Sequence, residues 1–397
     1  MDKISVIIYG PASFGNVIPT VHSIFNSTYR NLEVILLDDG TLTNIDSLRD
    51  EYEGKITHLK VSAASKSHLL NQAVACATGE MLAFMDGKDI SGKMRFELLV
   101  KKMLESSDAG LVFCGMTYIN QDGQFLQGVK LTNDFYSEQG LGRLFEGNFI
   151  GSISTTLMTQ EVFEKVGKFD EHVTINEDYD LFLRIAREFT IHYVNLPLLR
   201  YRVVPNFSRY SVKQRSESEH YILRKHDVGI IADSLTKIYN DEESFRLSLG
   251  QILNRMGREE EALQNYECVL SLNDKNSEVY FLIGNYFYQR GGLEEARTWY
   301  NKCLNYNPDH AGSRNNLGVI LYLLGALEES RLEFDRANHL RENYYDAIFN
   351  LRCLKKKAST GSLRITGVGE DSALLSLFHD IEYAHPVPRP SARKTRE

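Results

Sequence analysis

The stretch EMLAFMDGKD, residues 80–89, is a short apolar run that ends in two carboxylates with a lysine between them. An apolar run of this length, bounded by glycine and aspartate, is typical of a buried β-strand. Similar runs occupy residues 4–9, 32–39, 56–61 and 109–119. Amphipathic stretches alternate with them, among them 67–78 and 91–104, the second with Ser91 as its predicted N-cap. This alternation predicts an α/β domain with a largely parallel sheet covered by helices.

Acidic side chains close two of the predicted strands. Asp38 and Asp39 end the second run, and Asp86 and Asp89 follow the run quoted above. Ligands of open parallel sheets bind beyond the carboxyl ends of the strands. A single acidic strand end is as often a turn or helix-capping residue as part of a site. Two acidic strand ends that face the same crevice favour a site.

The composition of the 397-residue chain is that of a globular protein, with 43% hydrophobic and 25% charged residues. No apolar stretch has the length of a membrane span, and the first apolar run is too short for a signal-peptide core. These features predict a cytoplasmic protein. A net charge of −8 argues against nonspecific nucleic-acid binding. The five cysteines are scattered without close pairs, which favours reduced thiols over a metal or disulfide site.

A different pattern begins near residue 243. Leucine or isoleucine followed by glycine recurs every 34 residues, at Gly250, Gly284 and Gly318. An aromatic residue keeps the same register, at Tyr266, Tyr300 and Phe334. This period is that of the tetratricopeptide helix-turn-helix repeat, in which two helices approach closely at small residues. We therefore predict an all-α solenoid of three repeats with a capping helix over 243–357, preceded by a helical connector at 213–242 and followed by a weakly ordered tail at 358–397.

Five blocks of the first part resemble the family 2 glycosyltransferases in order and spacing. They are ISVIIYG (4–10), VHSIFNSTYRNLEVILLDDG (21–40), KSHLLNQAVACATGEMLAFMDGKD (66–89), EKVGKFDE (164–171) and NEDYDLFLRIA (176–186). The resemblance implies a GT-A fold over residues 1–212. It also implies a hexosyltransferase-type enzyme that uses a nucleotide-sugar donor, in this family most often UDP-linked, and inverts the anomeric carbon.

The resemblance assigns donor-binding roles to residues at the predicted strand ends. Asp39, or its neighbour Asp38, matches the position that accepts a hydrogen bond from the base, as a carboxylate does well from a uracil N–H. Lys66 matches a basic position that reaches the base or the diphosphate. Asp86 and Lys88 lie where the diphosphate is expected.

The block NEDYDLFLRIA supplies the expected catalytic base. An inverting displacement needs one carboxylate to deprotonate the acceptor hydroxyl. An isolated Glu-Asp pair at a helix start is more often ordinary capping, but here the pair follows VGKFDE and precedes an amphipathic helix. The resemblance makes Asp178 the expected base and Glu177 the second candidate, or a ligand of acceptor hydroxyls. Asp180 is expected at the surface or in a helix pairing.

The acidic motif raises the question of a metal ion. Most GT-A enzymes use Mn²⁺ or Mg²⁺ shared between protein oxygens and the diphosphate. Relatives commonly carry Asp-x-Asp-Asp, whereas this chain has Asp86, Gly87, Lys88 and Asp89. Many relatives also carry a histidine where this chain reads VVPNFS at 203–208.

Three interpretations of this motif stay open. Asp86 and Asp89 hold the ion after a small shift of the loop, with Lys88 turned to solvent. Alternatively, the Lys88 ammonium replaces part of the cation beside the diphosphate. In the third interpretation the site has decayed and the domain only binds.

The repeats suggest a protein partner, because tetratricopeptide arrays bind peptides and proteins in a groove. The expected acceptor is a protein or a glycan. Recruitment of a protein acceptor or partner by the repeats and simple self-association or stabilisation carry equal weight. The rival function is a non-catalytic interaction scaffold, favoured by Lys88 and the missing histidine. The joint presence of Asp39, Asp86 and Asp178 favours an enzyme. A dinucleotide-binding dehydrogenase is a weaker alternative, because no Gly-x-Gly-x-x-Gly follows the first strand.

Overall fold

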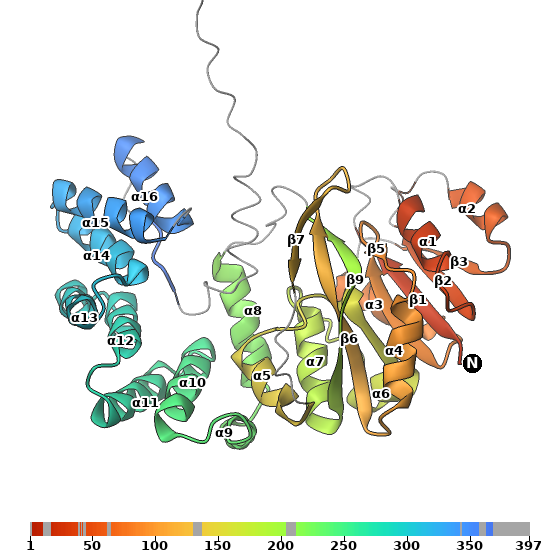
Figure 1. The fold of residues 1–397 in the computed structure, drawn as a ribbon, viewed down its shortest axis with the longest axis horizontal. Helices are drawn as coiled ribbons and strands as arrows, with labels where there is room; N and C mark the ends of the chain where they lie inside the picture. The colour runs from red at the N-terminus through yellow and green to blue at the C-terminus, as the bar shows by residue number, and fades with distance from the viewer. Residues whose placement is uncertain are drawn as a thin grey trace, which may run out of the picture. The chain divides into compact units, whose positions relative to one another are not determined.

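The computed structural model describes residues 2–10, 17–38, 40, 42, 45–61, 65–129, 137–203, 212–341, 344–356 and 363–367. The chain forms two compact units, Met1–Ile238 and Tyr239–Glu397 (Figure 1). The boundary falls inside the segment 213–242 that the sequence predicts as a connector. Helices α8 (Val212–Arg224) and α9 (Val228–Leu235) belong to the N-terminal unit.

A nine-stranded sheet forms the centre of the N-terminal unit. Its strands are β1 (Ile4–Tyr9), β2 (Leu32–Asp38), β3 (Ile56–Lys60), β4 (Met81–Asp86), β5 (Ile90–Ser91), β6 (Ala109–Ile119), β7 (Phe125–Val129), β8 (Thr156–Thr159) and β9 (Thr190–Arg202). The order is β3-β2-β1-β4-β8-β6-β9-β5, with β7 paired to β6. The first four strands in this order are parallel, while β8 is antiparallel to both its neighbours. The predicted α/β class is confirmed.

Seven α-helices accompany these strands in the described part of the chain up to residue 188. They are α1 (Ile18–Phe25), α2 (Ile45–Glu51), α3 (Lys66–Ala75), α4 (Arg95–Leu104), α5 (Gly140–Glu146), α6 (Gln160–Val166) and α7 (Glu177–Glu188). Helix α3 packs on β1 and β2, and α4 and α7 pack on β6 and β9. All six residues of β1 are buried. Burial of both faces explains why this strand is an unbroken apolar run rather than an alternating one.

The predicted N-cap at Ser91 is wrong. Helix α4 begins four residues later, at Arg95, and Met94 precedes it without a side-chain cap hydrogen bond. Ile90 and Ser91 instead form β5, which pairs with Arg200 and Leu199 of β9. A tertiary strand pairing has therefore prevailed over a local capping preference.

The C-terminal unit is built from paired helices, as the 34-residue period predicts. The helices are α10 (Glu242–Arg255), α11 (Glu259–Leu272), α12 (Ser277–Gln289), α13 (Leu293–Tyr306), α14 (Ala311–Leu323), α15 (Leu327–Leu340) and α16 (Tyr345–Lys356). A Cβ atom on Gly284 would lie 2.5 Å from the Tyr300 ring, and the equivalent distances are 2.6 Å at Gly250 and 2.7 Å at Gly318. Each glycine thus lets an aromatic ring of the next helix pack directly on the backbone.

Residues 363–367 depart from the weakly ordered tail that the sequence predicts for 358–397. They lie against the C-terminal unit, and Thr366 is only 4% exposed. Residues 357–362 and 368–397 lie outside the described part of the chain.

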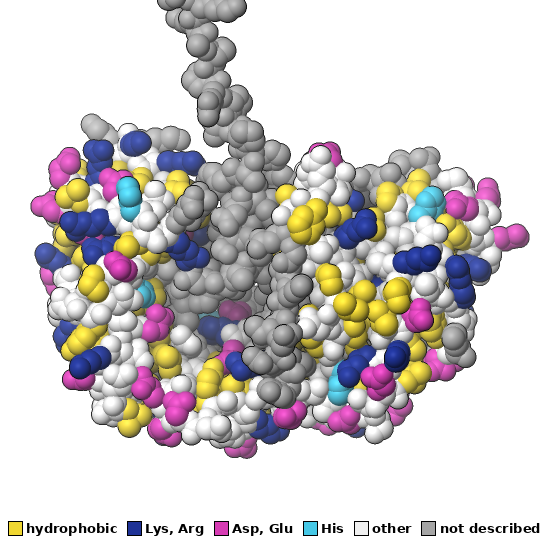
Figure 2. Space-filling model, in the orientation of Figure 1, with side chains coloured by type: hydrophobic (Ala, Val, Ile, Leu, Met, Phe, Trp, Pro, Cys, Tyr) yellow, Lys and Arg dark blue, Asp and Glu magenta, His cyan; other side chains and the backbone are white. Residues whose placement is uncertain are grey.

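The surface carries both signs of charge. Figure 2 shows basic and acidic side chains interspersed over the described residues in view, rather than a basic patch. In the described segments, no helix combines the length and the apolar character needed to cross a membrane.

Candidate functional site

The site begins where β1 and β4 end side by side. Tyr9 and Asp86 are partners in the register of these two strands, and the Gly87 N–H donates to the Tyr9 carbonyl at 2.7 Å. Gly10 follows with φ of +139°, and a Cβ atom there would lie 3.0 Å from an Asp86 carboxylate oxygen. The glycine therefore lets the backbone turn away close to the carboxylate.

Lys88 points at Asp86 rather than into solvent. Its ammonium lies 2.5 Å from Asp86 Oδ2 and 5.1 Å from the centre of the Tyr201 ring. Lys88 is 7% exposed. Burial alone lowers the pKa of this ammonium, but Asp86, Tyr201 and Asp89 outweigh burial and raise it above the ordinary value. The lysine is therefore a buried cation at the strand end.

Asp89 is buried beneath the Asp86–Lys88 pair and connects the acidic motif to β9. It is fully buried, and its Oδ1 accepts from the Arg202 backbone N–H at 3.0 Å. The Arg202 guanidinium donates in turn to the Lys88 carbonyl at 3.0 Å. Burial raises the pKa of Asp89 to about 7, against the lowering effect of Lys88. Asp89 thus holds the loop in place.

These residues do not fit the divalent cation that the resemblance implies. Asp86 already forms an ion pair with the Lys88 ammonium. Asp89 is buried and accepts a hydrogen bond from the Arg202 backbone N–H. Within the described ranges, no three His, Cys, Asp or Glu side chains lie together as a metal-binding group. Of the segment VVPNFS, only Val203 belongs to the described residues.

A second ion pair lies at the N-termini of α3 and α7. Lys66, the first residue of α3, places its ammonium 2.5 Å from Glu177 Oε1 and 4.0 Å from the centre of the Tyr9 ring. Glu177, the first residue of α7, is 6% exposed. Burial lowers the pKa of Lys66, but Tyr9, Glu177 and Asp178 raise it well above the ordinary value. Tyr9 is the strand partner of Asp86 and its ring contacts the Lys66 ammonium, so the two ion pairs lie at one site.

Asp178, the residue after Glu177 in α7, is partly exposed. Its Oδ1 accepts from the Tyr179 N–H at 2.8 Å. Burial raises the pKa of Asp178 to about 6, helped by the negative charge of Glu177 and opposed by Lys66. A carboxylate with this pKa is ionised near neutral pH and is a stronger base than an ordinary aspartate.

The turn into α7 directs both acids. Asn176 has φ of +61°, and among the described residues it is the only non-glycine with positive φ. Asparagine tolerates this left-handed conformation better than most residues. The VGKFDE block precedes this turn and is bound to α7 by hydrogen bonds, which help to place Glu177 and Asp178 at the site.

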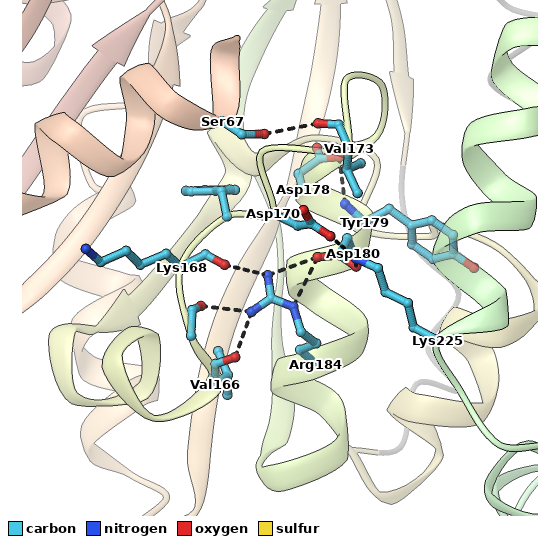
Figure 3. A network of polar contacts seen from close by, with 12 residues as sticks. Ser67, Val166, Lys168, Asp170, Val173, Asp178, Tyr179, Asp180, Arg184 and Lys225 are labelled. Atoms are coloured by element: carbon cyan, nitrogen blue, oxygen red, sulfur yellow. Dashed lines mark hydrogen bonds and ion pairs between the residues drawn. The ribbon is translucent and has the colours of Figure 1, made fainter.

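Figure 3 shows the network that holds this turn. Arg184 of α7 donates to the carbonyls of Val166, Gly167 and Lys168 at 2.7, 2.8 and 3.0 Å. Asp180 binds Arg184 at 3.0 Å and Lys225 at 2.6 Å, and it is fully buried. Of the two positions predicted for Asp180, the structure shows the helix pairing and not the surface: Arg184 of the same helix and Lys225, directly after α8, neutralise its charge.

Helix α3 is bound to the same loop. Ser67 donates to the Val173 carbonyl at 3.1 Å. The Asn71 side chain donates to the Phe169 carbonyl and accepts from the Phe169 N–H, both at 3.0 Å. These bonds fix the beginning of α3 relative to α7, and so they position Lys66 beside Glu177.

Asp38 lies at the end of β2 with both carboxylate oxygens engaged. Oδ2 contacts His58 Nε2 at 2.8 Å, and Oδ1 accepts from the N–H groups of Gly40 and Leu42 at 2.8 and 3.3 Å. The partners hold the pKa of Asp38 below its ordinary value, although burial acts the other way. Asp39 lies outside the described residues.

Sequence reasoning missed the aromatic and arginine partners of the site. Tyr9 and Tyr201 place their rings beside the two lysines, and Arg202 binds the loop of the acidic motif. The sequence did contain one signal for Tyr9: it is the last residue of the first strand, and ligands bind at the strand ends. The dipeptide Tyr201-Arg202 ends β9, which crosses to this edge only in the folded sheet.

Comparisons with known proteins agree with this architecture. The family model described as glycosyl transferase family 2 matches residues 6–167. Tetratricopeptide models match residues 247–304 and 284–325.

Two curated relatives and one solved structure illustrate the likeness. An uncharacterized glycosyltransferase of Rickettsia prowazekii is 22% identical over 294 residues, which cover 72% of this chain and 87% of the relative. The O-antigen biosynthesis glycosyltransferase WbnJ of Escherichia coli is 27% identical over 236 residues, 57% of this chain and 89% of the relative. The S. aureus TarS 1-349 structure has a TM-score of 0.46 and 15% identity, covering 86% of this chain and 93% of that chain. Residues 6–167 belong to glycosyl transferase family 2, and the chain is a glycosyltransferase domain joined to tetratricopeptide repeats.

Proposed function

We propose that this glycosyltransferase moves a sugar from a nucleotide-sugar donor, UDP-linked, to an acceptor hydroxyl with inversion of the anomeric carbon. The observation that carries the proposal is the partly exposed Asp178, whose raised pKa suits a base, on the same site as the cations Lys66 and Lys88. A carboxylate for the acceptor and cations for the leaving group are the two requirements of an inverting displacement.

The donor would bind at the strand ends through charge. Lys66 and Lys88 offer two ammonium groups toward a diphosphate, each already held by one carboxylate. Recognition of the base falls to Asp39 rather than Asp38, because the Asp38 carboxylate is engaged within the protein. Glu177 acts as a positioning residue for Lys66.

The fit of the residues supports Lys88 in place of a metal ion. A cation fixed 2.5 Å from Asp86 already neutralises the carboxylate that would bind Mn²⁺ or Mg²⁺. When the diphosphate departs, its developing negative charge would be met by this ammonium.

The transfer is a single displacement. Asp178 takes the proton of the acceptor hydroxyl while the acceptor oxygen forms a bond to the anomeric carbon. The bond from that carbon to the diphosphate oxygen breaks, and the nucleoside diphosphate carries away the electron pair. The repeats would recruit a protein that is the acceptor or brings it.

Nucleotide release from UDP-sugars tests the proposal. The full chain is incubated with UDP-glucose, UDP-galactose or their N-acetylated forms, and released UDP is measured with Asp178→Asn beside it. We expect the substitution to lower release by about 10²- to 10⁴-fold while UDP binding stays within a few-fold. Glu188→Gln, an exposed acid at the end of the same helix, is the matched control. Equal release by wild type and Asp178→Asn would remove Asp178 from the base role, and UDP binding without release from any donor would favour the scaffold.

A further inference from the structure

Two asparagines of the C-terminal unit bind the backbone of the chain's own segment 363–367. Asn350 accepts from the Arg364 N–H and donates to the Arg364 carbonyl, both at 2.8 Å. Asn316 does the same for Thr366, at 2.8 and 3.0 Å. Both asparagines are fully buried. Each side-chain amide thus pairs with one residue as a neighbouring β-strand would.

The spacing of the two asparagines matches the spacing of a peptide. They are 34 residues apart, so they occupy the same position in the last repeat and in the capping helix. Their two partners are two residues apart, and in an extended chain such residues face the same side. The two asparagines therefore form a two-rung ladder that binds the peptide backbone and not its side chains.

The Asp346 carboxylate binds the side chains of both Arg364 and Thr366. Asp346 Oδ1 accepts from Arg364 Nε at 2.7 Å, and Oδ2 accepts from the Thr366 hydroxyl at 3.1 Å. The Arg364 guanidinium lies 4.8 Å from the centre of the Tyr345 ring. The Thr366 hydroxyl also contacts the Tyr344 hydroxyl. Asp346 and the two tyrosines thus contact the side chains of an arginine and a threonine separated by one residue.

A third buried asparagine, outside the 34-residue register, adjoins the ladder. Asn285 of α12 is 4% exposed, and its oxygen accepts from the Tyr300 hydroxyl at 2.7 Å and from the Asn316 amide at 2.8 Å. Its own amide nitrogen is buried and makes no hydrogen bond to any described residue. An unpaired buried donor beside the ladder is a ready contact for a further ligand carbonyl.

We propose that this face of the C-terminal unit, formed by Asn285, Asn316, Asn350 and Asp346, is a binding surface for an extended Arg-x-Thr segment of a partner protein. Residues 363–367 occupy it as an internal competitor. The inference rests on the proposed function only for the partner being a protein, and it is independent of the transfer chemistry. A partner binds when its segment displaces the internal one.

Fluorescence anisotropy of a labelled peptide tests whether this surface binds such a segment. The probe is fluorescein-GSLRITGVG, a copy of residues 361–369, added to the full chain. A tethered competitor acts at an effective concentration near the millimolar range, so we expect Arg364→Ala/Thr366→Ala to bind the probe at least about tenfold more tightly than wild type. The matched control probe is GSLAIAGVG, which we expect to bind neither chain.

Three results would overturn the proposal. They are equal probe affinity of the two chains, equal affinity for the two probes, and no probe binding to Arg364→Ala/Thr366→Ala. Adding Asp346→Asn to that variant removes the charge that reads arginine and is expected to weaken probe binding at least tenfold. UDP titration of each chain separates the two proposals, because a failed transferase leaves the probe results unchanged.

Discussion

The Lys88 ammonium lies 2.5 Å from Asp86 Oδ2, within the motif where relatives commonly carry acids. A buried ammonium and a divalent cation compete for the same carboxylate, since both need it as a counter-charge. In the structure Lys88 is buried on Asp86 and does not turn to solvent. This contact favours the interpretation in which Lys88 itself faces the diphosphate.

UDP binding is therefore expected to survive metal removal. Calorimetric titration of the full chain with UDP should give the same affinity in Mn²⁺ and in excess EDTA, within about threefold. Lys88→Ala should weaken binding in EDTA by about tenfold or more, because one charge-assisted contact is lost. Lys93→Ala, outside the motif, is the control. Binding that vanishes in EDTA would return the metal to Asp86 and Asp89.

The pH dependence of transfer should report Asp178. Because burial raises its pKa to about 6, the base is protonated and inactive below that value and ionised above it. We expect kcat to fall about tenfold per pH unit below pH 6 and to be level between pH 7 and 8. A rate that stays constant from pH 5 to 8 would contradict the role of Asp178.

The same raised pKa predicts an effect on stability. The folded pKa of Asp178 lies above the unfolded value of 3.8, so its contribution is fully present below pH 3.8 and is lost as pH rises through about 6. Asp178→Asn should therefore melt at a higher temperature than wild type at pH 8, with the difference vanishing near pH 4. Glu188→Gln should show no such pH-dependent difference. A loss of stability in Asp178→Asn at pH 8 would mean that the ionised carboxylate stabilises the fold.

Lys66 should determine the pH below which kcat falls, called here the acidic limb of the pH profile. Its positive charge lowers the pKa of Asp178, and its removal leaves the repulsion from Glu177 unopposed. In Lys66→Met, at saturating donor, we expect the limb of kcat to move upward by about one pH unit or more. Lys60→Met, at the exposed end of β3, should leave it in place. An unshifted limb with weaker donor binding would restrict Lys66 to the diphosphate.

Much of the fold could be predicted because its signals are local. The apolar run at 4–9 coincides with β1, and the 34-residue period gives the helix pairs with their glycine-aromatic contacts. The failures involve distant partners. Ser91 has good capping chemistry, yet pairing with Leu199 draws it into a strand. The predicted helix pairing of Asp180 is present, but its partner Lys225 directly follows a later helix and could not be identified from the sequence.

The residues of the candidate site could be predicted from the sequence, but the orientation and contacts of their side chains could not. The quoted blocks predict Lys66, Asp86 and Asp178 as site residues. Tyr9 links Asp86 to Lys66, and Lys66 binds Glu177, the neighbour of Asp178. The sequence could not show that Lys88 turns inward, because the ring of Tyr201 that faces its ammonium comes from β9, more than 100 residues later. It could not show the ladder of Asn316 and Asn350 either, since its ligand lies in a segment without periodicity.

Close packing of glycine against an aromatic ring should govern the stability of the repeats. In Gly284→Ala the new Cβ atom would lie 2.5 Å from the Tyr300 ring, so the helices must separate. We expect a loss of about 1–3 kcal/mol, larger than the helix-propensity gain of about 1 kcal/mol. Trp299 is the single tryptophan and lies in α13, so its fluorescence during urea unfolding reports on this unit.

A double-mutant cycle makes this prediction specific. In a Tyr300→Leu background the ring is gone, so Gly284→Ala should cost less than it does in the wild-type background. Gln289→Ala, at the exposed end of the same helix, should shift the Trp299 transition by less than about 0.5 kcal/mol. An equal cost of Gly284→Ala in both backgrounds would mean that the glycine is needed for a reason other than the Tyr300 contact, because a clash with an absent ring cannot contribute.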